Sequence, residues 1–199
     1  MESRIRSRCP GPVAFVFSGG SSLGALHAGM LRAVHEAGIE PDFLVGTSAG
    51  ALNAAFMGKG FTAERVRELA RIWTDLSTQD VFPGLGIWSS LRCAIGAGTL
   101  ASPSGLKRII DRHLPETHAA LAIPTAVIAS DLATGSAVAF RDGDLRRHVL
   151  ASASIPGVFP PVAAEGRTFI DGGVSSHVPL LPARDLGAKT MVVFDTGFP

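Results

Sequence analysis

The sequence has little cysteine, no excess of charge and no long hydrophobic run. Its 199 residues include two cysteines, too few for the disulfide framework of a small secreted domain. Lysine and arginine number 18 against 17 for aspartate and glutamate, and the formal net charge of +1 gives no field to hold nucleic acid. No stretch approaches about 18 consecutive apolar residues, the length of a membrane span. We therefore expect a soluble cytoplasmic protein, at most peripheral to a membrane, that binds no nucleic acid.

The pattern of apolar residues predicts a single α/β domain. Hydrophobic residues make up 46% of the chain and charged residues 18%, which excludes a disordered chain. We expect strands at 13–17, 43–45, 125–129, 137–140, 168–170 and 191–194, and helices at 23–34, 49–57, 62–76, 106–114 and 149–162. Strands that alternate with helices near the N-terminus are typical of a βαβ unit and a parallel sheet. Nothing in the sequence indicates an oligomeric state.

Two segments flank or interrupt this domain. We interpret residues 1–12, which carry several arginines, as a flexible tail, and residues 13–199 as the folded domain. Residues 77–103 are rich in glycine, proline, leucine and tryptophan and almost free of charge, so we expect an irregular apolar cap. This cap either packs on its own domain or, around residues 82–88, lines a pocket for an acyl chain and meets a lipid surface.

A candidate nucleophile lies between an expected strand and an expected helix. Residues 46–50 read Gly-Thr-Ser-Ala-Gly and match the pattern G-x-S-x-G in the strand–turn–helix context that the motif requires. Gly46 and Gly50 would remove side chains that collide across so sharp a turn. Ser48 would then project its hydroxyl above the sheet at the N-terminus of a helix, where the helix dipole favours negative charge.

A serine nucleophile needs a base, and the histidines are the first candidates. His27 falls on the buried face of a predicted helix, where a packed, hydrogen-bonded core residue is the better interpretation. Four others lie in charged helical or loop surroundings and are expected to be solvated: His35, His113, His118 and His148. His177 follows a strand end and is the one histidine that we place beside the sheet.

Asp171 is a stronger candidate for the base than any histidine. It ends an apolar strand and precedes two glycines, so neighbouring backbone can approach its carboxylate closely. A second glycine-rich turn, at residues 18–24, would aim backbone N–H groups at an anion. It lacks the spacing of a dinucleotide fingerprint and the lysine of a nucleotide-binding loop, so it is better interpreted as an oxyanion hole.

These elements, in this order, resemble the patatin-like phospholipase family. Residues 19–24 are similar to its glycine-rich oxyanion loop, residues 46–50 to its G-x-S-x-G, and Asp171–Gly172 to its D-G motif. Segments between these motifs are also similar to the family sequence, so the resemblance spans most of residues 13–194. The resemblance implies a single three-layer α/β domain with a mainly parallel central sheet. It also implies Ser48 and Asp171 as a catalytic dyad, with Gly19, Gly20 and Ser21 forming the oxyanion hole.

The implied function is hydrolysis of acyl esters of lipids: phospholipids, lysophospholipids or neutral lipids. No cofactor is implied, and no metal, because cysteine and histidine never cluster at ligand spacings. Two departures from the family pattern concern the oxyanion loop, where Ser21 replaces a glycine and Leu23 replaces a basic residue. They leave open a catalytically weak lipid-binding or regulatory module. A Ser-His-Asp esterase that uses His177 is the other alternative.

Overall fold

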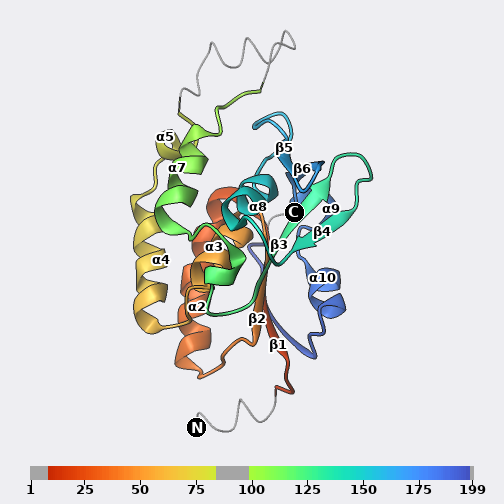
Figure 1. The fold of residues 1–199 in the computed structure, drawn as a ribbon. Coiled ribbons are helices and arrows are strands. Elements are labelled where there is room, and N and C mark those ends of the chain that lie inside the picture. Colours follow the sequence, from red (N-terminus) through yellow and green to blue (C-terminus); the bar gives the residue numbers. More distant parts are fainter. Residues whose placement is uncertain (1–8, 84–98, 198–199) are drawn as a thin grey trace.

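The computed structural model describes residues 9–83 and 99–197, and within them seven strands form one sheet (Figure 1). The strands are β1 (Val13–Phe17), β2 (Phe43–Thr47), β3 (Thr125–Asp131), β4 (Ala137–Phe140), β5 (Val162–Ala164), β6 (Arg167–Asp171) and β7 (Thr190–Phe194). The helices are α2 (Leu26–Glu36), α3 (Ala49–Met57), α4 (Ala63–Asp75), α5 (Thr78–Val81), α7 (Ser104–His113), α8 (Leu145–Ser152), α9 (Gly173–Ser176) and α10 (Leu180–Asp185), with 3-10 turns η1 (Ser21–Ala25) and η2 (His118–Ala120).

The sheet has a parallel half and an antiparallel half that meet at β3. Its order is β5-β6-β3-β2-β1-β7, with β4 also paired to β3. Strands β7, β1, β2 and β3 run parallel. The central three, β1, β2 and β3, are mostly apolar and almost fully buried, as expected for parallel strands covered on both faces, whereas β7 lies at the edge and is partly exposed. Strands β4, β5 and β6 are antiparallel to their neighbours. This arrangement confirms the predicted α/β class with a mostly parallel sheet.

The antiparallel half places two strand ends against each other on one edge of β3. Val127 pairs with Gly46 of β2 on one side and with β4 on the other. Ala129 pairs with Asp171 of β6 on the side opposite β4, so β6 lies on the same edge as β2. The last pair of β2 is Thr47–Ile128, and the last residue of β6 pairs one position further along. The ends of β2 and β6 therefore meet from opposite directions.

Helices cover the sheet unequally on its two faces, which gives the three layers. Helices α2, α3, α4, α7 and α8 lie on one face, and α9 and α10 lie on the other (Figure 1). The larger core lies on the first face, where Phe194 stacks on Phe17 and meets Phe15 edge to face. A smaller core of Val16, Val45, Ile128 and their neighbours packs against Ala183 of α10. No helix in the described ranges is long and apolar enough to cross a membrane.

Two predicted helices differ from those in the structure. The stripe expected over 23–34 begins instead as the 3-10 turn η1, in which Leu23 is exposed. Helix α2 starts at Leu26, which is also exposed, and it buries His27, Ala28 and Leu31. The helix expected over 149–162 is α8, which starts earlier because the Asp144 side chain accepts the Arg147 N–H at its N-terminus.

The predicted tail and cap are only partly covered by the described residues. Residues 1–8 of the tail and 84–98 of the cap, including Trp88, lie outside them. The described part of the cap holds the short helix α5, which begins with a capping box in which Asp80 accepts the Ser77 backbone N–H. Phe82 stacks on Phe159, with ring centroids 5.4 Å apart, so this part of the cap packs onto the domain.

Candidate active site

Ser48 lies on a sharp turn between the end of β2 and the start of α3. Its backbone has φ 55° and ψ −122°, a conformation that costs free energy for any residue with a side chain. The turn is possible because of the two flanking glycines. A methyl group on Gly46 would come within 2.3 Å of the Gly50 carbonyl oxygen, and one on Gly50 within 2.4 Å of the Ser18 carbonyl oxygen.

Asp171 reaches Ser48 because β6 ends where β2 ends. The Ser48 hydroxyl donates a hydrogen bond of 2.7 Å to Asp171 Oδ2, and the Gly173 N–H donates one of 2.7 Å to Oδ1. Gly172 permits this approach, since a methyl group there would lie 2.2 Å from the Ile128 carbonyl oxygen. Both side chains are nearly buried, Ser48 with 7% of its surface exposed and Asp171 with 6%. The structure thus brings together the two residues that the sequence singled out.

The environment of Asp171 makes its carboxylate a stronger base than a solvated aspartate. Burial raises the pKa of the Asp171 carboxyl, although the hydrogen bonds from Ser48 and Gly173 act in the opposite direction. A raised pKa increases the affinity of the carboxylate for a proton. A carboxylate in contact with a serine hydroxyl in this state is suited to accept its proton.

Ser152 is a supporting residue that sequence reasoning missed. Its hydroxyl accepts the Ser48 backbone N–H at 2.8 Å and donates to the Ile128 carbonyl oxygen at 2.5 Å. This bridge fixes the turn of Ser48 to both α8 and β3. It also occupies the Ser48 N–H, which is therefore not a donor to the substrate in this arrangement. The run of small residues around Ser152 was the one signal available for it in the sequence.

The predicted oxyanion loop lies beside Ser48, and its backbone N–H groups differ in whether they already donate a hydrogen bond. The N–H of Gly19 donates to the His177 carbonyl oxygen at 3.0 Å, so that group is occupied. The N–H groups of Gly20 and Ser21 donate to no acceptor in the described part of the chain. Gly20 has φ 141° and Ser21 has φ 52°, so the position where the family pattern has a third glycine does adopt a left-handed conformation.

His177 lies next to this site without standing between Ser48 and Asp171. A methyl group on Gly19 would come within 3.0 Å of the His177 ring, and one on Gly173 within 3.5 Å of its Nδ1. A Ser-His-Asp triad requires the imidazole to accept the serine proton and to donate to the aspartate. Here the serine hydroxyl donates directly to the aspartate.

The other histidines divide between expected and unexpected positions. His27 is fully buried, and Asn53 Nδ2 lies 2.9 Å from its Nδ1, which confirms the expected core residue. Burial lowers the pKa of His27 to about 4, so the ring is neutral. His118 and His148, expected to be solvated, are buried; His148 stacks on Phe140 with ring centroids 3.9 Å apart. Their burial depends on tertiary contacts that charged neighbours in sequence do not indicate.

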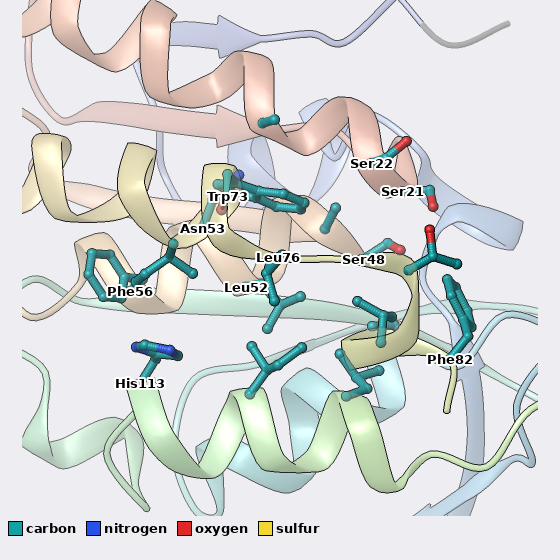
Figure 2. A pocket seen from close by; sticks show the side chains of 18 of the residues that line it. Ser21, Ser22, Ser48, Leu52, Asn53, Phe56, Trp73, Leu76, Phe82 and His113 are labelled. Atoms are coloured by element: carbon teal, nitrogen blue, oxygen red, sulfur yellow. Dashed lines mark hydrogen bonds between the residues drawn. The ribbon is translucent and has the colours of Figure 1, made fainter. Parts of the chain in front are cut away.

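An apolar cavity of about 250 Å³ opens beside Ser48 (Figure 2). Ser48 and Ser21 lie at one end, and Phe56 and His113 at the other. The walls come from helices α3, α4 and α7 and from residues near α5 and α8, including Leu52, Leu69, Ile72, Leu106, Ile109, Phe82 and Phe159. Asn53 of α3 links two other parts of the wall by hydrogen bonds: it accepts the Trp73 indole N–H at 2.8 Å and donates to the Gly24 carbonyl oxygen. The cavity suits a linear apolar group.

The family model described as patatin-like phospholipase matches residues 15–184. The chain belongs to the patatin-like phospholipase family. As a member of this family, it is 30% identical over 187 residues to patatin-like phospholipase domain-containing protein 6 of Mus musculus, and 33% identical over 192 residues to domain-containing protein 7 of Rattus norvegicus. Both alignments cover 93% of this chain, but only 13% and 14% of the relatives.

This patatin-like phospholipase domain is also similar to a mycobacterial protein and to a solved bacterial structure. An uncharacterized NTE family protein of Mycobacterium bovis is 31% identical over 189 residues, which cover 95% of this chain and 50% of the relative. Among solved structures, VipD from Legionella pneumophila matches with a TM-score of 0.60 and 15% identity, over 85% of this chain and 47% of that one. The likeness to VipD concerns the fold alone. The chain spans at most half the length of these relatives.

Proposed function

We propose that this chain is a serine acyl hydrolase that cleaves carboxylic esters of lipids through a Ser48–Asp171 dyad. The observation that carries the proposal is the 2.7 Å hydrogen bond from the Ser48 hydroxyl to Asp171, placed at one end of an apolar cavity. A nucleophile in contact with a buried base has the geometry for attack on a carbonyl carbon. The adjacent cavity has the character needed to hold the acyl chain that the carbonyl carries.

The proposed reaction has two halves. Asp171 takes the proton of Ser48 as its oxygen attacks the ester carbonyl, and the tetrahedral intermediate collapses when the leaving alcohol receives that proton. Asp171 then deprotonates a water molecule that attacks the acyl-enzyme, and it returns this proton to Ser48 Oγ as the bond to the acyl carbon breaks and the fatty acid leaves. In both intermediates the oxyanion is stabilised by the N–H groups of Gly20 and Ser21, since that of Gly19 is engaged with His177.

A labelling experiment and a substrate panel test this proposal together. A fluorophosphonate probe should label Ser48 in the wild type and leave Ser48→Ala unlabelled. Turnover of short esters, neutral glycerides, lysophospholipids and phospholipids should then be lost in Ser48→Ala. Labelling without turnover of any ester would favour a lipid-binding module with a reactive serine. The absence of both labelling and turnover would refute the hydrolase.

The size of the cavity sets the acyl length that fits. A methylene group needs about as much space as a water molecule, about 30 Å³, so 250 Å³ holds about eight. Ser48 and Phe56 are eight positions apart along α3, about 12 Å at 1.5 Å per residue. At about 1.2 Å per bond of an extended chain, that length takes about ten bonds. Both measures point to acyl chains of about eight to ten carbons.

We expect the hydrolysis of p-nitrophenyl esters to follow this limit. Each methylene added to the acyl chain should raise kcat/KM by up to about fourfold, because burial of one contributes about 0.8 kcal/mol. The increase should stop near eight to ten carbons. Ile109→Trp, which narrows the cavity from α7, should move the limit to shorter chains. The control Arg108→Trp, on the exposed side of α7, should leave it in place; an unchanged limit in Ile109→Trp would contradict this assignment.

The raised pKa of Asp171 gives a prediction for the pH profile. The base works only when ionised, so kcat/KM should fall as pH drops through its raised pKa. The acid limb should therefore lie above the range of a solvated aspartate, whose pKa is about 3.9. Profiles of kcat/KM between pH 4 and 9 check this for the wild type and for His177→Ala. An acid limb that disappears in His177→Ala would assign the titration to the imidazole and contradict the dyad.

A further inference from the structure

Two hydroxyl groups hold the carbonyl of Gly19, at the start of the oxyanion loop. Thr196 Oγ1 donates to the Gly19 carbonyl oxygen at 2.9 Å, and Ser18 Oγ lies 2.9 Å from the same oxygen. The Thr196 backbone N–H donates to Ser18 Oγ at 3.0 Å, which ties the two side chains together. Ser18 is fully buried and Thr196 is 8% exposed. Both follow the ends of neighbouring parallel strands, β1 and β7.

Fixing this carbonyl also fixes an N–H group. In a trans peptide the C=O and the N–H of one unit point in opposite directions. The carbonyl of Gly19 and the N–H of Gly20 belong to the same unit, so the contact with Thr196 turns the Gly20 N–H to the other side of the loop. That unit lies close to the nucleophile: a methyl group on Gly19 would be 3.6 Å from Ser48 Cβ.

The Gly20 N–H has the properties of a donor kept for a ligand. Gly20 is buried, yet its N–H donates to no acceptor in the described part of the chain. Buried N–H groups without an acceptor are rare in folded proteins, because each loses its hydrogen bonds to water. A peptide between two glycines is also the easiest kind to rotate. An anchor on its carbonyl is therefore needed if the N–H is to be directed before substrate binds.

We propose that Thr196, assisted by Ser18, is a positioning residue that orients the Gly19–Gly20 peptide so that the Gly20 N–H donates to the oxyanion. The proposal rests on the proposed hydrolase function and deepens it. Thr196 touches neither the substrate nor Ser48; it acts through the peptide that it holds. Its close packing also explains the glycine at position 20, where a methyl group would lie 2.4 Å from Thr196 Oγ1.

The test compares Thr196→Val, which keeps the shape and loses the hydroxyl, with Thr196→Ser, which keeps the hydroxyl. Removal of one oxyanion donor lowers kcat by about 100- to 1000-fold, and loss of its orientation should cost part of that, about 10- to 100-fold. The loss should fall on kcat and leave KM unchanged, because the oxyanion exists only in the transition state and intermediates. Thr196→Ser should restore most of the rate. Ser18→Ala, which keeps the Thr196 bond, should lose less than Thr196→Val.

Thr190→Val, at the first residue of β7, is the matched control. The Thr190 hydroxyl also donates to a backbone carbonyl, that of Pro10 at 2.8 Å, but at the opposite end of β7. It should not change kcat. A trifluoromethyl ketone, whose adduct with Ser48 carries an oxyanion, should bind Thr196→Val more weakly by the factor lost in kcat/KM, whereas product fatty acid should bind equally well.

The outcomes separate this inference from the proposed function. If wild-type turnover depends on Ser48 while Thr196→Val keeps the wild-type kcat, the hydrolase stands and the inference is wrong. A raised KM with unchanged kcat, or a lower kcat that Thr196→Ser does not restore, likewise assigns Thr196 a structural role. If Thr196→Val does not fold, the kcat values of Thr196→Ser and Ser18→Ala are compared with that of the wild type. A lower kcat in Ser18→Ala, with most of the rate kept in Thr196→Ser, supports the inference, and an unchanged kcat in Ser18→Ala contradicts it. Absence of Ser48-dependent turnover in the wild type refutes both.

Discussion

Ser48→Ala and Asp171→Asn should each lower the hydrolysis of a short ester by about four orders of magnitude or more, as for residues that act as one catalytic unit. Alanine removes the nucleophile. Asparagine keeps the shape of the aspartate and can still accept the Gly173 N–H, but it cannot take a proton. The double variant should be no worse than either single one. Steady-state kinetics, with circular dichroism to check the fold, provide the measurement.

His177→Ala is the matched control for this pair, since its ring lies in the same site. Its loss should be far smaller than that of either dyad variant, because the Ser48 hydroxyl donates directly to Asp171 and not to the ring. A loss as large as that of Ser48→Ala would replace the dyad by a Ser-His-Asp triad. The carbonyl of His177 holds the Gly19 N–H and is retained in the alanine variant, so the backbone contact is not disturbed.

The second large effect is expected from Gly20→Ala in the oxyanion loop. A methyl group there would meet Thr196 Oγ1 at 2.4 Å, and φ 141° is disfavoured for any residue with a side chain. The loop must move, and the oxyanion should lose a donor, with kcat lower by about 100-fold or more. Single-turnover kinetics of acyl-enzyme formation measure this step directly.

Gly29→Ala separates this effect from a general cost of replacing glycine. Gly29 lies on the exposed side of α2, where a methyl group meets nothing within 4 Å. The substitution should leave kcat unchanged and raise the free energy of unfolding by up to about 1 kcal/mol, since alanine is the better helix former. Equal rates for Gly20→Ala and Gly29→Ala would show that the loop around Gly20 takes no part in catalysis.

The sequence predicted the features of this site that depend on local backbone geometry. Glycines at positions 46 and 50 are needed because their neighbours' carbonyl oxygens leave no room for a methyl group. Gly172 is needed for the same reason where β6 ends, and it marks Asp171. Sharp turns and close approaches restrict the amino acid at a single position, so they leave a signal that can be recognised without knowing the fold.

Features that depend on contacts between distant segments left no such signal. Thr196 and Ser152 are ordinary hydroxyl residues in sequence, and their roles follow from which carbonyl or N–H they meet after the sheet has formed. The burial of His118 and His148 has the same origin, as their rings pack together with centroids 5.4 Å apart between segments far apart in the chain. That β2 and β6 pair with the same edge of β3 likewise depends on strand register, and short apolar runs in the sequence do not specify register.

The separation of Ser48 and Asp171 along the chain means that the two residues are added at different times during synthesis. The bonded side chains of Ser48 and Asp171 are 123 positions apart. At a synthesis rate of about 5 to 20 residues per second, the aspartate is added about 6 to 25 s after the serine. During that interval the growing chain carries the serine without the proposed base, which is brought to Ser48 by the pairing of β6 with β3. A ribosome-bound chain that stops before β6 would therefore carry the serine but hydrolyse no lipid.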